Sequence, residues 1–161
     1  MENMMQDIFT PEMMDMITKL GAALLLGAVL GIERIHAHKT AGMRTYALVS
    51  MGSALFVMVS EMARMMPGVL SADPLRMATQ IVVGVGFLGA GLIIARENRV
   101  TGLTTASGLW VSAGIGAASG FGFFTLASIA TVFTLFIFTL LWSIERTIVE
   151  VTEKNNHPPE N

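Results

Sequence analysis

The stretch VTGLTTASGLWVSAGIGAASGFGFFTLASIATVFTLFIFTLLWSI, residues 100–144, decides the fold, because none of its 45 residues is Asp, Glu, Lys or Arg. A helix needs roughly 20 apolar residues to cross the hydrocarbon core of a bilayer, so this stretch is long enough for two crossings. A helix on the surface of a soluble protein needs a polar face toward water, and this stretch has no charged side chain to form one. It therefore predicts two membrane-spanning helices, with the turn between them at Gly120-Phe121-Gly122.

Three more charge-free stretches precede this pair, at residues 20–32, 45–60 and 77–95. The chain of 161 residues is 53% hydrophobic and 14% charged, whereas an average soluble domain is about 25% charged. We therefore predict an all-α membrane protein, a polytopic helical bundle of about five transmembrane helices. The expected parts are an amphipathic lead-in at 1–15, a five-helix transmembrane domain at 16–144 and a polar cytoplasmic tail at 145–161.

The composition also excludes several classes of function. The formal net charge of −2 implies no nucleic-acid partner. The absence of cysteine excludes disulfides and Cys-ligated zinc. The sequence shows no Ser/His/Asp set and no paired carboxylates placed for acid–base chemistry, so we expect no enzyme and no cofactor. His36 and His38 have no evident third ligand, so we expect loop residues there rather than a metal site.

The distribution of Lys and Arg predicts the orientation in the bilayer, because these residues accumulate in cytoplasmic loops. One side of the predicted bundle has seven of them and the other side has three. The seven are Arg34, Lys39, Arg44, Arg96, Arg99, Arg146 and Lys154, and the three are Lys19, Arg64 and Arg76. We therefore expect the N-terminus outside and the C-terminus in the cytoplasm.

Glycine is frequent inside the charge-free stretches. The segment from Gly84 to Gly89 fits the G-x-G-x-x-G pattern of dinucleotide-binding loops, but such a loop must follow a strand and open a helix. Small residues inside membrane helices instead let two backbones approach closely. We therefore expect helix packing at Gly27, Gly31, Gly84, Gly86, Gly89, Gly91, Gly116 and Gly120.

Charged residues surround the first predicted cytoplasmic turn. Glu33, Arg34 and Arg44 either anchor the helix ends at the interface or form a buried site. An acid buried at that depth needs a partner, and a tight hairpin would bring Glu33 and Arg44 together. Because successive helical residues diverge by about 100°, Arg34 would then point elsewhere.

Further polar residues complete the candidate functional set. Asp73 is typical of a helix N-cap, and Gln80 makes either a structural bond between helices or a ligand contact. The hydroxyls after Gly102 either bond to their own helix or form a polar seam facing Gln80. The set comprises Glu33, Arg34, Arg44, Thr45, Asp73, Arg76, Gln80, Thr104 and Thr105.

Several of these segments together resemble one known family. In order along the chain they are Gly31-Ile-Glu-Arg34, Ala41-Gly-Met-Arg-Thr45, Asp73-Pro-Leu-Arg76, Gln80, Gly84-Val-Gly-Phe-Leu-Gly-Ala-Gly91, Gly102-Leu-Thr-Thr-Ala106 and Trp110. Each motif alone is weak, but their order and spacing over residues 20–138 are similar to the MgtC/SapB family of bacterial inner-membrane proteins.

The resemblance implies a multi-pass protein of the bacterial inner membrane with about five spans. Members of the family are linked to survival under magnesium limitation and to intracellular virulence. Some bind other membrane proteins, including the F-type ATP synthase. The virulence-associated members have a cytoplasmic C-terminal domain, whereas about 17 polar residues follow the last predicted helix here, so we expect the shorter SapB-like form.

Two functions are consistent with these observations. The first is a regulator that acts through helix contacts with other membrane proteins, which predicts glycine-lined surfaces and no continuous polar path. The second is a small channel or transporter for an ion or small solute. Five short spans make a thin transporter, so we expect a homo-oligomer in the bilayer. Transport predicts one cavity, with Glu33 and Arg44 at its mouth, shared by Gln80, Thr104, Thr105 and Ser107.

Overall fold

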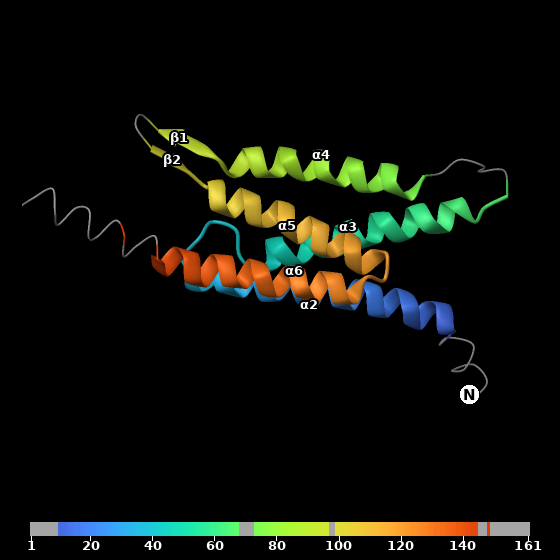
Figure 1. Ribbon diagram of the computed structural model, residues 1–161. Helices are drawn as coiled ribbons and strands as arrows, with labels where there is room; N and C mark the ends of the chain where they lie inside the picture. Colours follow the sequence, from blue (N-terminus) through green and yellow to red (C-terminus); the bar gives the residue numbers. More distant parts are fainter. Residues whose placement is uncertain (1–9, 68–72, 97–98, 145–147, 149–161) are drawn as a thin grey trace, which may run out of the picture.

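The computed structural model describes residues 10–67, 73–96, 99–144 and 148, and within these it shows a bundle of five helices (Figure 1). The helices are α2 (Pro11–His36), α3 (Met43–Arg64), α4 (Pro74–Leu92), α5 (Leu103–Gly120) and α6 (Phe124–Phe136), and α6 continues into the π-helix η1 (Ile137–Leu141). Successive helices run in opposite directions along the bundle. The predicted helical membrane fold is therefore confirmed.

The helices differ in how much of their surface can face lipid. Among the described residues, three helical segments are long and apolar enough to cross a membrane, namely 11–36, 43–64 and 124–144. Helix α5 is shorter and richer in small residues, and it packs against α2, α3, α4 and α6. Because its neighbours cover much of its surface, α5 needs less apolar area toward lipid than the outer helices.

Helix α2 begins five residues before the predicted transmembrane domain. Pro11 occupies the first turn of the helix, where its missing N–H is not needed. The hydroxyl of Thr10 caps this end by accepting a hydrogen bond from the Met13 N–H at 3.2 Å. Residues 1–9 of the lead-in lie outside the described residues, as does the tail apart from Ile148.

A two-stranded hairpin joins α4 to α5, which the helical prediction did not include. Strand β1 (Ile94–Arg96) pairs antiparallel with β2 (Arg99–Thr101), so that Ile94 lies opposite Thr101. Gly102 follows with φ +91°, and a side chain there would collide with the Leu92 carbonyl. Glycine is required at this position because other residues rarely adopt a positive φ.

The predicted turn between the last two spans is confirmed. Helix α5 ends at Gly120, and Gly122 adopts φ +81°, a value that favours glycine. The N–H of Phe123 then donates to the Ala118 carbonyl at 2.8 Å, which satisfies a carbonyl at the helix end. The chain therefore reverses without a long loop.

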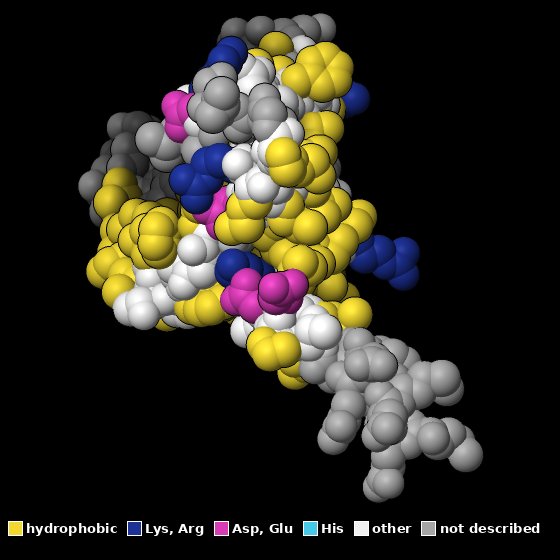
Figure 2. All heavy atoms as spheres, turned by 90° about the vertical axis from the view of Figure 1, so that its right-hand side faces the viewer, with side chains coloured by type: hydrophobic (Ala, Val, Ile, Leu, Met, Phe, Trp, Pro, Cys, Tyr) yellow, Lys and Arg dark blue, Asp and Glu magenta, His cyan; other side chains and the backbone are white. Residues whose placement is uncertain are grey.

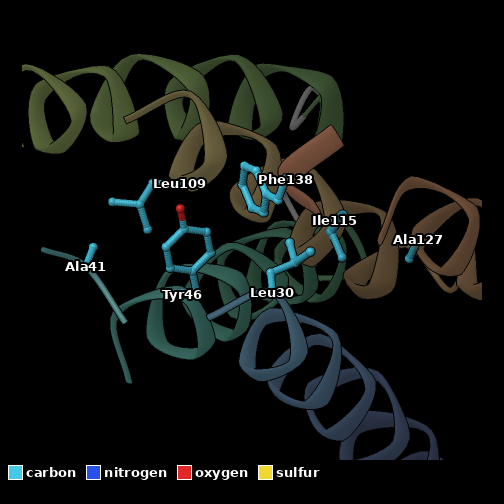
Figure 3. Close-up of a cluster of buried hydrophobic side chains, with 7 residues drawn as sticks. All are labelled: Leu30, Ala41, Tyr46, Leu109, Ile115, Ala127 and Phe138. Atoms are coloured by element: carbon cyan, nitrogen blue, oxygen red, sulfur yellow. The ribbon is translucent and has the colours of Figure 1, made fainter. Parts of the chain in front are cut away.

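The main hydrophobic core joins four of the helices, as Figure 3 shows. Tyr46 of α3 is fully buried at its centre, and Leu109 of α5 and Phe138 of η1 lie close to it. The complete cluster is Leu30, Ala41, Tyr46, Leu109, Ile115, Ala127 and Phe138. This core joins α2, α3, α5, α6 and η1.

Glycines allow α3 to pack closely between α2 and α5. A methyl group built at Gly27 would lie 2.7 Å from the Tyr46 carbonyl oxygen, and one at Gly120 would lie 2.8 Å from the Ala54 carbonyl oxygen. Methyl groups at Gly31 and Gly116 would also collide with the α3 backbone or the residue before it. These four glycines therefore lie where two helix backbones approach closely, which is the arrangement that the packing prediction requires.

The same prediction is wrong within this chain for three glycines of α4. No described atom lies within 4 Å of a methyl group built at Gly84, Gly86 or Gly91, and one at Gly89 would make an ordinary contact with Ala106 at 3.5 Å. The reason is that α4 faces α5 through Ile81, Val85 and Gly89, which leaves the other glycines on its outer surface.

Single cysteines can test the predicted orientation, because the natural chain contains none. Met65, which is 78% exposed at the end of α3, and His38, exposed in the loop after α2, lie at opposite ends of the bundle. We expect an impermeant maleimide to label Met65→Cys but not His38→Cys in intact cells, and to label both after permeabilisation. Labelling of only His38→Cys in intact cells would show that the orientation is the opposite of the predicted one.

Candidate functional site

A buried ion pair lies at the end of the bundle where α2 ends. The side chain of Arg34 is 3% exposed, and its guanidinium donates to the carboxylate of the preceding residue, Glu33, which is 16% exposed. The guanidinium carbon also lies 3.6 Å from the centroid of the Phe138 ring, a cation–π contact. A carboxylate and an aromatic face thus replace the water that Arg34 loses on burial.

The position of Arg34 on α2 explains its burial. Gly27, Leu30, Gly31 and Arg34 recur at the spacing of one helix face, and all four are buried. This face packs against α3, and the glycines bring the two backbones close together. Arg34 therefore continues the packed face into the last turn of the helix.

Tyr46 links α3 to the start of α5 beside this ion pair. Its hydroxyl donates to the Thr105 carbonyl oxygen at 3.2 Å, and its own carbonyl accepts from the Ser112 hydroxyl at 3.0 Å. Gly108 makes room for this contact, because a side chain there would collide with the Tyr46 hydroxyl and the Phe138 ring. Such interhelical bonds average about 0.6 kcal/mol in membrane proteins.

The π-helix η1 supplies the fourth element of the site. Residues 137–141 form one turn wider than an α-helix, and Phe138 is buried within this turn. Short π-helices inside α-helices are rare and occur frequently at functional sites. We name Glu33, Arg34, Tyr46, Thr105 and Phe138 the Arg34 cluster, in which residues of four helical segments meet.

The expected pairing of Glu33 with Arg44 is wrong, and so is the expectation that Arg34 points away. Glu33 pairs with Arg34, whereas the side chain of Arg44 is exposed in the first turn of α3. Arg34 lies on the face of α2 that packs against α3, and the 100° between neighbouring residues does not prevent two long side chains from pairing. Thr45, beside Arg44, is exposed as well.

Gln80 lies apart from the Arg34 cluster. It lines a cavity of about 570 Å³ between α3 and α4, together with Ser53 of α3 and Gly84 of α4. Neither Thr104 nor Thr105 lines this cavity. Thus the structure does not bring Gln80 and the hydroxyls of α5 into one cavity, which was the arrangement expected for a transport path.

The remaining hydroxyls and charges serve mainly the helices that contain them. Ser107 donates to the Leu103 carbonyl of its own helix, and Thr104 is exposed. Asp73 immediately precedes α4, as expected of an N-cap, and its carbonyl accepts from the Arg76 N–H at 3.0 Å. The Arg76 side chain is exposed. Trp110 is 53% exposed.

A second polar region lies at the opposite end of the bundle, where α2 begins. Figure 2 looks onto this end and shows acidic and basic side chains close together, with hydrophobic side chains along the flanks. A cavity of about 580 Å³ here has carboxylates of Glu12, Asp15 and Glu61 on its wall, and Lys19 pairs with Asp15 at 2.7 Å. Among the described residues, no group of three His, Cys, Asp or Glu is arranged to hold a metal ion.

Sequence reasoning missed two members of the Arg34 cluster. Tyr46 is the single tyrosine of the chain and lies in a charge-free stretch, which is a usable signal for a buried hydroxyl. Phe138 is one of nine phenylalanines and lies within a long apolar stretch, so nothing in the sequence distinguishes it.

Comparison with known proteins assigns the chain to a family. The family model described as "MgtC family" matches residues 20–147. The chain is 43% identical to "Protein MgtC" of Brucella abortus over 136 residues, which cover 83% of this chain and 52% of that protein. It is 46% identical over 121 residues to "Putative magnesium transporter YhiD" of Escherichia coli K12, covering 72% of this chain and 55% of that protein.

A shorter relative is also similar. "Protein SrpB" of Synechococcus elongatus is 43% identical over 142 residues, which cover 81% of this chain and 78% of that protein. The chain thus spans about half the length of the MgtC and YhiD relatives and a larger share of SrpB. No solved structure matches it. From the family match over residues 20–147 and these identities, we conclude that the chain belongs to the MgtC family of membrane proteins.

Proposed function

We propose that this protein is a multi-pass inner-membrane regulator that acts through helix contacts with other membrane proteins during adaptation to magnesium limitation. The printed name of the YhiD relative refers to magnesium, which supports the magnesium-related part of the proposal. The resemblance that links family members to low magnesium and to virulence supports the same physiological setting. The F-type ATP synthase is the first partner to test on that basis.

The observation that supports regulation best is the separation of the polar side chains. The Arg34 cluster uses its charges and its tyrosine hydroxyl on contacts within the bundle. Among the described residues, no buried side-chain nitrogen or oxygen lacks a hydrogen-bond partner. Polar groups that are already paired with each other are poorly suited to replace the hydration shell of a passing ion. The outer surface, in contrast, presents long apolar helices that other membrane proteins can contact.

One observation favours the alternative, a small oligomeric channel or transporter. The cavity at the end where α2 begins has three carboxylates on its wall, and a cation entrance of a channel is commonly acidic. Of the three, Glu61 lies on α3, whereas Glu12 and Asp15 lie on the first turns of α2. Asp15 is paired with Lys19 and Glu12 is exposed, whereas Glu61 is half-buried, so Glu61 is the residue whose charge should matter most if this cavity admits a divalent cation.

Magnesium flux and growth together separate the two functions. We expect purified protein in proteoliposomes containing a magnesium-sensitive dye to give no flux above that of protein-free liposomes. We also expect the gene to restore growth of its deletion strain at low magnesium. Restored growth without flux supports regulation, since the protein then acts on growth without moving the ion itself.

The matched variant Glu61→Gln is the control for transport, because it removes one charge from the cavity and retains the size of the side chain. Magnesium flux by the natural protein that falls several-fold in Glu61→Gln would overturn the regulatory proposal in favour of transport. Flux that is equal in both proteins would overturn it too, and would direct attention away from this cavity.

A further inference from the structure

Helix α4 carries an amide on its outer face that the rest of the described chain does not satisfy. Gln80 is exposed on the wall of the cavity between α3 and α4, and no described residue forms a hydrogen bond with its side chain. The adjacent Thr79 is different, because its hydroxyl donates to the Arg76 carbonyl at 2.7 Å. Gln80 thus needs a partner from outside the described part of the chain.

The depth of Gln80 makes this need strong. It lies four residues beyond Arg76, which corresponds to about 6 Å along the helix axis. From Gln80 to the end of α4 at Leu92 the helix contains no charged residue, so we infer that this face lies against hydrocarbon in the bilayer. An amide without a hydrogen bond is unfavourable in hydrocarbon, where no water can replace the missing partner.

The shape around Gln80 is that of a groove beside a projecting side chain. Gly84, Phe87 and Gly91 lie within about 40° of Gln80 around the helix. The Phe87 side chain is 82% exposed, while methyl groups built at Gly84 and Gly91 would meet no described atom within 4 Å. Gly52 on the α3 wall of the same cavity is equally open. The surface therefore has a projecting side chain, Phe87, and beside it a groove with room for such a side chain.

We propose that a second copy of this chain packs against this surface, with the two α4 helices side by side across a two-fold axis. All copies insert in the same direction, so such an axis runs along the bilayer normal and places equal residues at equal depth. An amide has both a donor and an acceptor, so Gln80 can pair with Gln80 of the second copy. Phe87 of each copy then enters the groove of the other, beside Gly84.

A lipid acyl chain is a poorer occupant of the same groove. It would fill the apolar space but would leave the amide of Gln80 without a hydrogen bond. The proposed dimer goes beyond the proposed regulatory function and does not depend on it. Its test measures association alone, so the regulatory role can fail while the interface remains, and the reverse also holds.

Disulfide cross-linking in native membranes tests the two-fold axis. With the otherwise cysteine-free chain, we expect copper-phenanthroline oxidation to convert Gln80→Cys largely to a covalent dimer. The matched control is Val82→Cys, which lies two residues away and faces a different cavity, beside Trp110. We expect it to give at least five-fold less dimer. Because Gln80→Cys removes the proposed amide pair, Gly91→Cys, which is on the same face and retains Gln80, is oxidised in parallel. Equal cross-linking at Gln80→Cys and Val82→Cys, or none at both Gln80→Cys and Gly91→Cys, would overturn the interface.

A pair of glycine variants tests the groove without disturbing the single chain. Gly84 and Gly86 are both open on α4, but only Gly84 lines the groove. We expect Gly84→Leu to reduce the dimer fraction in liposomes at least ten-fold, measured by energy transfer between labelled copies, and Gly86→Leu to leave it within two-fold. An equal loss of dimer in both variants would overturn the proposal. A natural chain that is monomeric in liposomes would also overturn it, and would indicate that lipid or another protein covers the groove.

Discussion

The variant Gly116→Ala is expected to lose most of its folded protein in detergent, although it adds only one methyl group. The methyl group would collide with the carbonyl group of Ser50, which belongs to the backbone of α3. A side chain could rotate away from it, but a backbone carbonyl in the middle of a packed helix can move only with the helix. Overpacking of a core typically costs about 1–3 kcal/mol, and we expect a value in the upper part of this range.

The matched control is Gly114→Ala on the same helix. A methyl group at Gly114 meets no described atom within 4 Å. In a helix interior, alanine is more favourable than glycine by about 0.8–1 kcal/mol, so this variant should be at least as stable as the natural protein. The two unfolding midpoints, measured by tryptophan fluorescence in detergent, should therefore move in opposite directions. Parallel shifts would mean that α5 does not approach α3 through Gly116.

The second large effect is expected at Arg34. In Arg34→Leu the carboxylate of Glu33 loses its cation, and removing one partner of a buried ion pair costs about 3–5 kcal/mol. In Glu33→Gln the buried guanidinium loses its counter-charge but retains the Phe138 ring. The double variant, with neither charge, should be more stable than the sum of the two single effects predicts. Unfolding midpoints and folded yield of the three variants measure this coupling.

Arg44→Gln is the control for this prediction, because Arg44 lies just after the loop that follows Arg34, and its side chain is exposed. An exposed charge contributes about 0–1 kcal/mol, so its removal should be nearly silent. Arg34→Lys should be intermediate, since it retains the charge but loses the planar group that stacks on Phe138. Equal and additive effects at Arg34 and Arg44 would contradict a buried ion pair and would leave both residues as anchors at the membrane edge.

Much of the architecture follows from local properties of the sequence. The lengths of the charge-free stretches predict the number of helices, because a span has a minimum length that is set by the bilayer. Asp73-Pro74 predicts the start of α4, and Gly120-Phe121-Gly122 predicts the turn before α6. These features depend on residues that are adjacent in the chain, so no knowledge of distant contacts is needed to recognise them.

The faces of the helices could be predicted only in part. Gly116 and Gly84 are similar in sequence, since both are glycines inside an apolar helix, yet one packs against α3 and the other is open. In a soluble protein the apolar side of a helix marks the core. In a membrane, lipid is as apolar as the core, so hydrophobicity does not distinguish a helix neighbour from a lipid neighbour.

The sequence by itself thus determined the class of protein, the number of helices and several of their ends. The burial of Arg34 was decided by tertiary structure, because it requires α3 against one side of α2 and the Phe138 ring of η1 over the guanidinium. Arg34 and Phe138 are 104 positions apart in the chain and come together only when the last helix packs beside the first. A contact of this kind depends on which helices meet, and no local pattern of residues records that choice.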